Sequence, residues 1–267
     1  MKENSSDITY GNRLKKSLGQ HFLHDGRMQQ KVAGAIGDLH AFATIIEIGA
    51  GSGALTFQLL PQQHPSYWVV ELDPYWAEWL KQKTSKDGYK VNILNIDFLK
   101  LDLQHFAEPI YVIGNFPYNI SSQILFKIIE AKTKVAALTG MFQKEVAQRI
   151  TSSPGSKDYG ILSVLIQAYY TCEYLFDIPP VCFTPLPKVI SAMISLKRHN
   201  NELACNEKLF RKVVKTSFNQ RRKTLRNSLK TLLPAHCTQA PILSKRPEQL
   251  DLQGFIQLTH LCENATE

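Results

Sequence analysis

Several patterns typical of secreted, membrane-spanning or metal-binding proteins are missing from this 267-residue chain. Its five cysteines include no Cys-x-x-Cys pair, and their odd number argues against both a disulfide framework and a zinc cluster. No apolar run approaches the roughly 20 residues that span a bilayer. The polar segment 1–10 has no apolar stretch of the signal-peptide type. We therefore expect a cytoplasmic protein with no metal site and no membrane partner.

Acidic side chains are also absent from one long stretch, residues 208–246. The net charge is +8, and the excess lies at the two ends of the chain. Residues 1–31 hold six basic and three acidic side chains, and residues 201–267 hold eleven and six, whereas residues 32–200 hold fourteen of each. A neutral centre with basic ends suggests that the ends contact a polyanion, and a solvated basic helix explains the charge equally well.

Short apolar runs rich in β-branched residues alternate with segments of helical spacing through most of the chain. Strands are predicted at Thr44–Ile48, Tyr67–Leu72, Val91–Ile96, Ile110–Ile113, Val135–Phe142, Cys172–Ile178 and Ile190–Lys197. Helices are predicted at Ala54–Leu60, from Pro74 onward, and at Ser121–Ala131, Gln143–Ile150 and Tyr159–Tyr170. This alternation favours an α/β protein with a mostly parallel seven-stranded sheet and helices on both of its faces.

Composition shifts near residue 198, and the remainder has helical periodicity without a convincing strand. We therefore expect two domains. Residues 1–198 would form the α/β domain with a basic N-terminal arm, and residues 199–267 a small, basic, all-α domain.

Polar residues stand at four successive strand ends. They are Glu47 and Gly49, Glu71 and Asp73, Asp97, and Asn115. In an open α/β sheet, ligands bind at the carboxyl ends of the strands. A turn explains any one of these residues, but it explains four in a row poorly.

The glycine loop Gly49-x-Gly51-x-Gly53 would let the backbone approach a ligand closely. Glu71 lies 18 residues beyond Gly53, where a carboxylate can accept both hydroxyls of a ribose. Two cofactors fit this pattern equally, a nicotinamide dinucleotide and S-adenosylmethionine.

The tetrapeptide Asn115-Phe116-Pro117-Tyr118 separates these cofactors. The side-chain oxygen of Asn115 can accept one hydrogen of an exocyclic amine, and a backbone carbonyl fixed by Pro117 can accept the other. Tyr118 offers a face on which a flat ring can stack. A hydride-transfer site needs no double acceptor for an amine, whereas methyl transfer to an adenine amine does. An ordinary turn with a helix cap is the structural alternative.

Seven segments occur in the order found in one known family. They are Lys15-Lys-Ser-Leu-Gly19-Gln20-His21-Phe22-Leu23-His-Asp25, Glu47-Ile-Gly49-Ala-Gly51-Ser-Gly53, Glu71-Leu-Asp73, Asp97, Gly114-Asn115-Phe116-Pro117-Tyr118-Asn119-Ile120-Ser121, Phe183-Thr-Pro185-Leu-Pro187-Lys188-Val189 and Phe218-Asn-Gln-Arg221-Arg222-Lys223-Thr-Leu225-Arg226. On these segments the chain resembles the ribosomal RNA adenine dimethyltransferases, specifically the bacterial small-subunit (16S) type.

The resemblance implies a Rossmann-like class I methyltransferase that uses S-adenosylmethionine and dimethylates N6 of two adjacent adenosines in a hairpin loop near the 3′ end of small-subunit ribosomal RNA. It also implies residue roles. The cofactor would be held by His21, Leu23, Gly49, Gly51, Glu71, Asp97 and Asn115. The target amine would be held by Asn115 and the Phe116–Pro117 backbone, with the base between Tyr118 and Phe183.

The basic ends would bind RNA phosphates through Lys15, Lys16, Arg221, Arg222, Lys223 and Arg226, with an immature 30S particle as partner and the enzyme as a monomer. If residues 211–226 formed one helix, four of its basic side chains, Arg211, Lys215, Arg222 and Arg226, would lie within about 60° of arc. The alternative is that the segment Phe218-Asn-Gln interrupts that helix.

Three positions depart from the family pattern. His21 stands where Asn is usual, Ile96 where a Gly commonly precedes the acid, and Ile190 where an acid is usual. Alternative functions are a large-subunit enzyme conferring antibiotic resistance, a DNA adenine methyltransferase, a mainly structural ribosome assembly factor and an NAD-dependent dehydrogenase. The basic tail and the Pro-rich loop favour the small-subunit type, and the tetrapeptide argues against the dehydrogenase.

Overall fold

The chain divides into two compact units, each built from two stretches of sequence. The computed structural model describes residues 20–200, 202–234 and 239–263. Unit 1 comprises Met1–Lys144 and Leu175–Ser195, and unit 2 comprises Glu145–Tyr174 and Leu196–Glu267. Residues 145–174 therefore belong to the same unit as the C-terminal segment. The division into functional domains at residue 198 stays a prediction.

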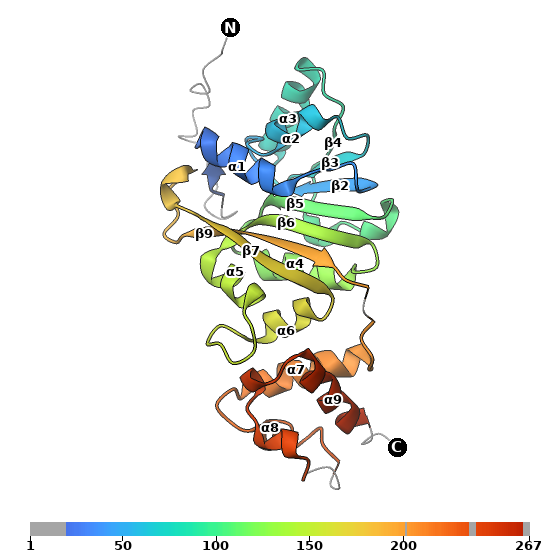
Figure 1. The fold of residues 1–267 in the computed structure, drawn as a ribbon. Coiled ribbons are helices and arrows are strands. Elements are labelled where there is room, and N and C mark those ends of the chain that lie inside the picture. Colours follow the sequence, from blue (N-terminus) through green and yellow to red (C-terminus); the bar gives the residue numbers. More distant parts are fainter. Residues whose placement is uncertain (1–19, 201, 235–238, 264–267) are drawn as a thin grey trace. The chain divides into compact units, whose positions relative to one another are not determined.

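A seven-stranded sheet forms the centre of the fold, in the order β4-β3-β2-β5-β6-β9-β7 (Figure 1). The strands are β2 (Thr44–Ile48), β3 (Tyr67–Val70), β4 (Asn92–Leu94), β5 (Ile110–Asn115), β6 (Val135–Gln143), β7 (Tyr170–Ile178) and β9 (Ser191–Arg198). The pairs β2–β3, β3–β4, β2–β5 and β5–β6 are all parallel. The fold class and the seven strands predicted from the sequence are confirmed.

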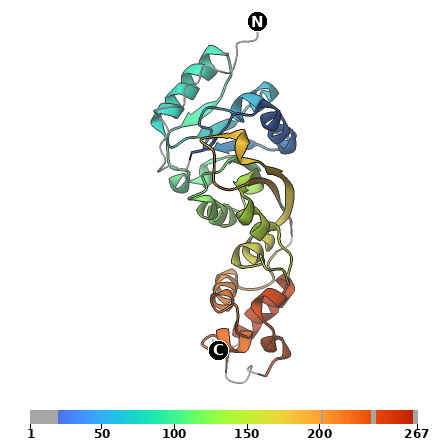
Figure 2. The same cartoon turned by 90° about the vertical axis from the view of Figure 1, so that its left-hand side faces the viewer.

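Helices follow most of these strands. They are α1 (Gly26–Ile36), α2 (Thr56–Leu59), α3 (Pro74–Lys86), α4 (Ser121–Glu130), α5 (Lys144–Thr151), α6 (Ile161–Gln167), α7 (Glu207–Asn219), α8 (Leu225–Ser228) and α9 (Leu252–Glu263). The bounds of α2 to α6 agree with the five predicted helices to within a few residues. No bounds were predicted for α1, α7, α8 or α9. Within unit 1, α1 and α4 lie on opposite faces of the sheet (Figure 2).

Asparagine and aspartate side chains begin several of these helices. Asp25 accepts from the backbone nitrogen of Met28 at the start of α1. Asp73 does the same for Tyr75 at the start of α3, and Pro74 occupies the first helical position. Both patterns satisfy backbone donors that a helix leaves unpaired at its N-terminus. Asp73 therefore caps a helix, so this strand-end acid has a structural role.

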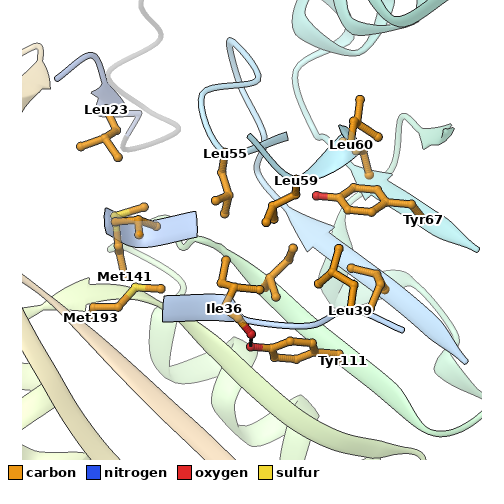
Figure 3. Close-up of a cluster of buried hydrophobic side chains, with 14 of the residues drawn as sticks. Leu23, Ile36, Leu39, Leu55, Leu59, Leu60, Tyr67, Tyr111, Met141 and Met193 are labelled. Carbon is orange, nitrogen blue, oxygen red and sulfur yellow. Dashed lines mark hydrogen bonds between the residues drawn. The ribbon is translucent and has the colours of Figure 1, made fainter. Parts of the chain in front are cut away.

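One large apolar cluster of unit 1 joins α1 and α2 to the sheet (Figure 3). Leu55 and Leu59 pack there with Met141, and the Tyr111 hydroxyl donates to the carbonyl of Ile36 over 2.9 Å. Alternate residues of a strand point to opposite faces, so burial on both faces explains why these strands read as continuous apolar runs. The cluster fixes the glycine loop between β2 and α2.

A two-stranded antiparallel sheet was not predicted from the sequence. Strand β1 (Phe22–Leu23) pairs with β8 (Phe183–Thr184), placing the segment just after residue 20 beside the Pro-rich loop. Each strand has only two residues, too few to show a periodicity, and the partners are about 160 positions apart. The pairing carries residues 20–23 to the carboxyl edge of the main sheet.

Unit 2 contains all of α5 except Lys144, and α6 to α9, and no strand lies within its described residues beyond Arg198. Helix α7 buries Phe210, Val213 and Val214, while α9 buries Phe255 and Leu258. The alternative of one continuous helix through residues 211–226 is wrong. Helix α7 ends at Asn219 and α8 begins at Leu225, so the interruption at Phe218-Asn-Gln is the alternative that holds.

No helix in the described part of the chain is long and apolar enough to cross a membrane. Within the same residues, His, Cys, Asp and Glu side chains form no group of three that could hold a metal ion.

Candidate active site

A cavity of about 150 Å³ opens at the carboxyl edge of the main sheet, entirely within unit 1. The polar strand-end residues Glu47, Gly49, Glu71, Asp97 and Asn115 all line it. After β2 the chain builds β3 and β4 on one side and then crosses back to place β5 on the other. Ligands of open α/β sheets bind at such a switch point, and here it brings Gly49 beside the tetrapeptide.

The glycine loop needs its glycines for two reasons. Gly49, Gly51 and Gly53 have φ angles of +68°, +52° and +77°, a region that side chains rarely adopt. A Cβ at Gly51 would also lie 2.5 Å from the Phe22 ring. The loop therefore passes directly under the segment that contains β1.

Glu71 is buried, and both of its carboxylate oxygens are oriented by backbone donors. Oε2 accepts from the nitrogen of Gly51 over 2.8 Å, and Oε1 accepts from the nitrogen of Asp73 over 2.9 Å. Burial raises the pKa of this carboxyl, and these hydrogen bonds oppose the shift. Each oxygen keeps a second lone pair, so the group can still accept a pair of vicinal hydroxyls.

Glu47 was noted as a strand-end acid but was not predicted as a site residue. Its carboxylate accepts from the hydroxyl of Tyr67 over 2.7 Å and of Thr56 over 3.0 Å, and it is only 1% exposed. Burial raises the pKa of Glu47 to about 7 against these two hydrogen bonds, and the nearby Glu71 carboxylate adds to the rise. The position of Glu47 near the end of β2 is the sequence feature from which its place in the site could have been predicted.

Asp97 follows β4 and caps the 3₁₀ helix Phe98–Lys100. Its Oδ1 accepts from the nitrogen of Leu99 over 2.9 Å, and Asp97 lines the cavity together with the exposed side chains of Ile96 and Leu72. These apolar side chains were not predicted as site residues. They suit the flat faces of a purine, and a carboxylate beside them suits its amino group.

The amide of Asn115 is oriented by the backbone of the N-terminal segment. Its Nδ2 donates to the carbonyl of His21 over 2.7 Å. A carbonyl oxygen can only accept, so this contact fixes which amide atom is which and leaves Oδ1 as an acceptor on the other side. Among the described residues nothing donates to Oδ1.

The next two residues are held in place by packing. The Phe116 ring is buried against Phe142, with centroids 4.9 Å apart. A Cβ at Gly140 would lie 2.3 Å from that ring, so only glycine leaves room for it. Pro117 accepts from the nitrogen of Ile120 over 3.2 Å and lines the cavity. The side chain of Phe116 thus anchors the turn, while its carbonyl accepts no hydrogen bond within the described chain.

Tyr118 lines the cavity with its hydroxyl hydrogen-bonded to Ser191. Burial raises the pKa of Tyr118, so the phenol is neutral at physiological pH. The His21 ring stacks on Tyr118 with centroids 5.4 Å apart, and its Nδ1 lies 2.8 Å from the carbonyl of Pro185. Leu23, two residues on, lines the cavity and reaches into the apolar cluster.

Phe183 does not join the cavity. Its ring is 2% exposed and belongs to the apolar cluster, while its backbone pairs with Leu23. The Pro-flanked sequence suggested an exposed loop, but the short pairing of β8 turns this ring inward. The stacking role implied for Phe183 stays a prediction that this arrangement does not support.

The C-terminal residues predicted to bind RNA belong to unit 2. Lys15 and Lys16 lie outside the described residues. Arg222, Lys223 and Arg226 are exposed, whereas Arg221 donates to the carbonyl of Ser156 over 3.1 Å and lies 3.9 Å from Glu248.

The sheet order, the glycine loop and the strand-end acids together define a class I methyltransferase that uses S-adenosylmethionine. The chain belongs to the ribosomal RNA adenine dimethylase family, whose model matches residues 11–252. The family, fold class and cofactor expected from the sequence are thereby confirmed.

Curated relatives and solved structures agree with this assignment. Ribosomal RNA small subunit methyltransferase A of Parabacteroides distasonis is 49% identical over 95% of this chain and 95% of its own. The protein of that name from Cytophaga hutchinsonii is 45% identical over 93% and 97%. The 23S rRNA methyltransferase ErmE superposes with a TM-score of 0.68 at 25% identity over 90% of this chain and 99% of its own. A dimethyladenosine transferase from Plasmodium falciparum superposes with a TM-score of 0.80 at 23% identity over 92% and 98%, which shows the fold.

Proposed function

We propose that this protein transfers methyl groups from S-adenosylmethionine to N6 of two adjacent adenosines in a hairpin loop near the 3′ end of small-subunit ribosomal RNA. The observation that carries the proposal is the orientation of the Asn115 amide, which lines the cavity and whose Oδ1 is left as an acceptor. The small-subunit methyltransferases that are 44–49% identical support this choice of RNA.

The residues around the cavity fit S-adenosylmethionine, which when bound supplies an electrophilic methyl group. Glu71, held by two backbone donors, can accept the ribose hydroxyls with its remaining lone pairs. Asp97 can accept from the adenine amino group, and Gly49 leaves the backbone open beside Pro117. The His21 carbonyl and Leu23 close the cavity from above the glycine loop.

The target amine is a poor nucleophile because its lone pair is delocalised into the purine ring. Asn115 Oδ1 and the carbonyl of Phe116 would each accept one amine hydrogen and favour a tetrahedral nitrogen. The face of Tyr118 would hold the flipped base against these acceptors. Catalysis is then positioning and electrostatics by preorganised groups, and no side chain acts as a nucleophile.

Affinity for RNA would come from phosphate contacts of exposed basic residues, including Arg222, Lys223 and Arg226 in the stretch that lacks acids. The partner would be an immature 30S particle, recognised by RNA shape. We propose that the enzyme acts as a monomer in the cytoplasm.

Labelled S-adenosylmethionine and immature small ribosomal subunits provide the test, followed by nucleoside analysis for N6,N6-dimethyladenosine. The Asn115→Ala variant should methylate about 10²–10³-fold more slowly, as when other preorganised polar groups are removed. Gln123→Ala, an exposed change in α4, is the matched control and should retain full activity. A wild-type rate from folded Asn115→Ala protein would refute this role.

The same assay separates the competing functions. Large-subunit RNA as substrate tests the alternative raised by the likeness to ErmE. An assembly factor without catalysis would bind the particles and leave no dimethyladenosine with either substrate. Labelling of small-subunit RNA alone is the result that we expect.

A further inference from the structure

His21 takes part in the site through its backbone and its side chain separately. The backbone carbonyl orients the Asn115 amide, while the ring stacks on Tyr118 at an interplanar angle of 27°. The ring is also tied to the Pro-rich loop, because Nδ1 lies 2.8 Å from the carbonyl of Pro185. A carbonyl oxygen can only accept, so Nδ1 carries the hydrogen in this contact.

The ring of His21 leaves no space for a base on this face of Tyr118. Their centroids are 5.4 Å apart, which is the spacing of two rings in direct contact. A purine inserted between them would need a separation of roughly 7 Å, twice the usual contact distance between carbon atoms. His21 therefore occupies one face of Tyr118, and both residues line the cavity.

Tyr118 is the fixed partner of this pair and His21 is the one that can move. The hydroxyl of Tyr118 is bonded to Ser191 in β9, and its backbone follows the anchored Phe116. Among the described residues, the His21 side chain is held by the single contact to Pro185 beyond the stack itself. Turning its side chain away would break that contact but leave the carbonyl on Asn115 unchanged.

We propose that the His21 imidazole is a displaceable cover on the stacking face of Tyr118, and that the target purine enters by taking its place. This inference rests on the proposed function, because it takes Tyr118 as the surface on which the base stacks. The cover keeps the aromatic face out of water while the site is empty. The purine must compete with a preformed stack, which lowers its apparent affinity.

Binding of adenosine in the presence of S-adenosylhomocysteine tests the cover directly. His21→Asn removes the ring and keeps the backbone carbonyl, so it should bind adenosine about threefold to tenfold more tightly, as expected for loss of one aromatic stack. His24→Asn is the matched control, because His24 is an exposed histidine on the same segment whose Nδ1 contacts Thr184 and not Tyr118. It should bind adenosine as the unsubstituted protein does.

Nuclear magnetic resonance of histidine-labelled, unsubstituted protein gives a second measurement that needs no variant to fold. The His21 ring protons should be shifted upfield by Tyr118, and adenosine should move them toward the values of an exposed imidazole. Three results would each overturn the proposal that His21 is a displaceable cover. They are weaker adenosine binding by His21→Asn, no adenosine binding by either protein, and saturation with adenosine without movement of the His21 signals. Loss of methylation in Asn115→Ala is measured separately, so the proposed methyl transfer is tested independently of the role proposed for His21.

Discussion

Burial decides the behaviour of Glu47. The carboxyl group of this residue lies near the end of β2 inside the apolar layer, where the hydroxyls of Thr56 and Tyr67 donate to it. In the folded protein the pKa of Glu47 is raised to about 7 from 4.5, so between these pH values the folded state holds a proton that the unfolded chain has released. This contribution to stability is complete below pH 4.5 and is lost as pH rises through 7.

Replacing Glu47 with Gln should remove this pH dependence. The free energy of unfolding of the unsubstituted protein should fall by roughly 3 kcal/mol through this term between pH 4.5 and 8, and that of Glu47→Gln should not. Urea unfolding at several pH values measures the difference. Glu78→Gln, an exposed change in α3, should follow the unsubstituted protein. Parallel pH curves for the unsubstituted protein and Glu47→Gln would contradict the assignment.

Gly51 links the glycine loop to the segment above it. An alanine there meets both a positive φ of +52° and the ring of Phe22 at 2.5 Å. Gly51→Ala should therefore cost about 1–3 kcal/mol of stability and weaken cofactor binding, as for other residues forced into the left-handed region. Thermal unfolding and calorimetric titration with S-adenosylhomocysteine measure the two effects.

Gly26→Ala is the control for that change, because a Cβ at Gly26 has no atom within 4 Å and the residue begins α1. It should leave both quantities unchanged. Equal cofactor affinity in Gly51→Ala and Gly26→Ala would show that the loop does not need its glycine.

The elements that could be predicted from the sequence are those with several apolar residues at the spacing of a strand or a helix. Strands β2 and β5 are short runs with β-branched residues, and their ends were placed within two residues. The pairing of β1 with β8 escaped prediction because two residues carry no pattern. The inward ring of Phe183 escaped for the same reason, since nothing local distinguishes it from an exposed loop residue.

The turn between α7 and α8 divides the basic residues by role. Arg221 donates to the carbonyl of Ser156 and faces Glu248, so it fastens the segment after α5 within unit 2. Arg222 is exposed beside it. Charge alone predicted the same role for both residues, whereas their contacts indicate different ones.

Alanine at each of these arginines should therefore have a different effect. Arg221→Ala should lower stability by about 1 kcal/mol, the net value of an ordinary hydrogen bond, because the partly exposed Arg221 side chain is screened by water. Arg222→Ala should leave stability unchanged and reduce the salt dependence of RNA binding by about one phosphate contact. Unfolding curves and RNA binding between 50 and 200 mM salt, roughly the range in which such contacts weaken, give both readings. The reverse pattern would assign the phosphate contact to Arg221.

At the scale of the whole molecule, the cofactor site lies in one unit, and the boundary between the two units does not pass through it. Every residue that lines the cavity lies between Gln20 and Met141, within unit 1. The strand order and glycine loop made this site predictable from sequence. The membership of residues 145–174 in unit 2 was not predictable, because it depends on packing against helices that come later in the chain.

A chain ending at residue 198 should therefore keep the cofactor site but lose stability. Helix α6 buries Val164 and Leu165, and Tyr159 packs edge-on against Phe218 with centroids 6.2 Å apart. Ending the chain before α7 removes Phe218 and the rest of the C-terminal helices. The apolar surface that this exposes contributes more than about 2 kcal/mol to the free energy of unfolding when it is buried, so its exposure lowers the melting temperature by roughly 4–8 °C. Cofactor affinity should stay the same because no residue lining the cavity is removed. Calorimetry with S-adenosylhomocysteine and thermal unfolding of the two chains measure these quantities. An unchanged melting temperature would mean that residues 145–174 fold without the C-terminal segment of unit 2, and a lost affinity would mean that unit 1 depends on that segment.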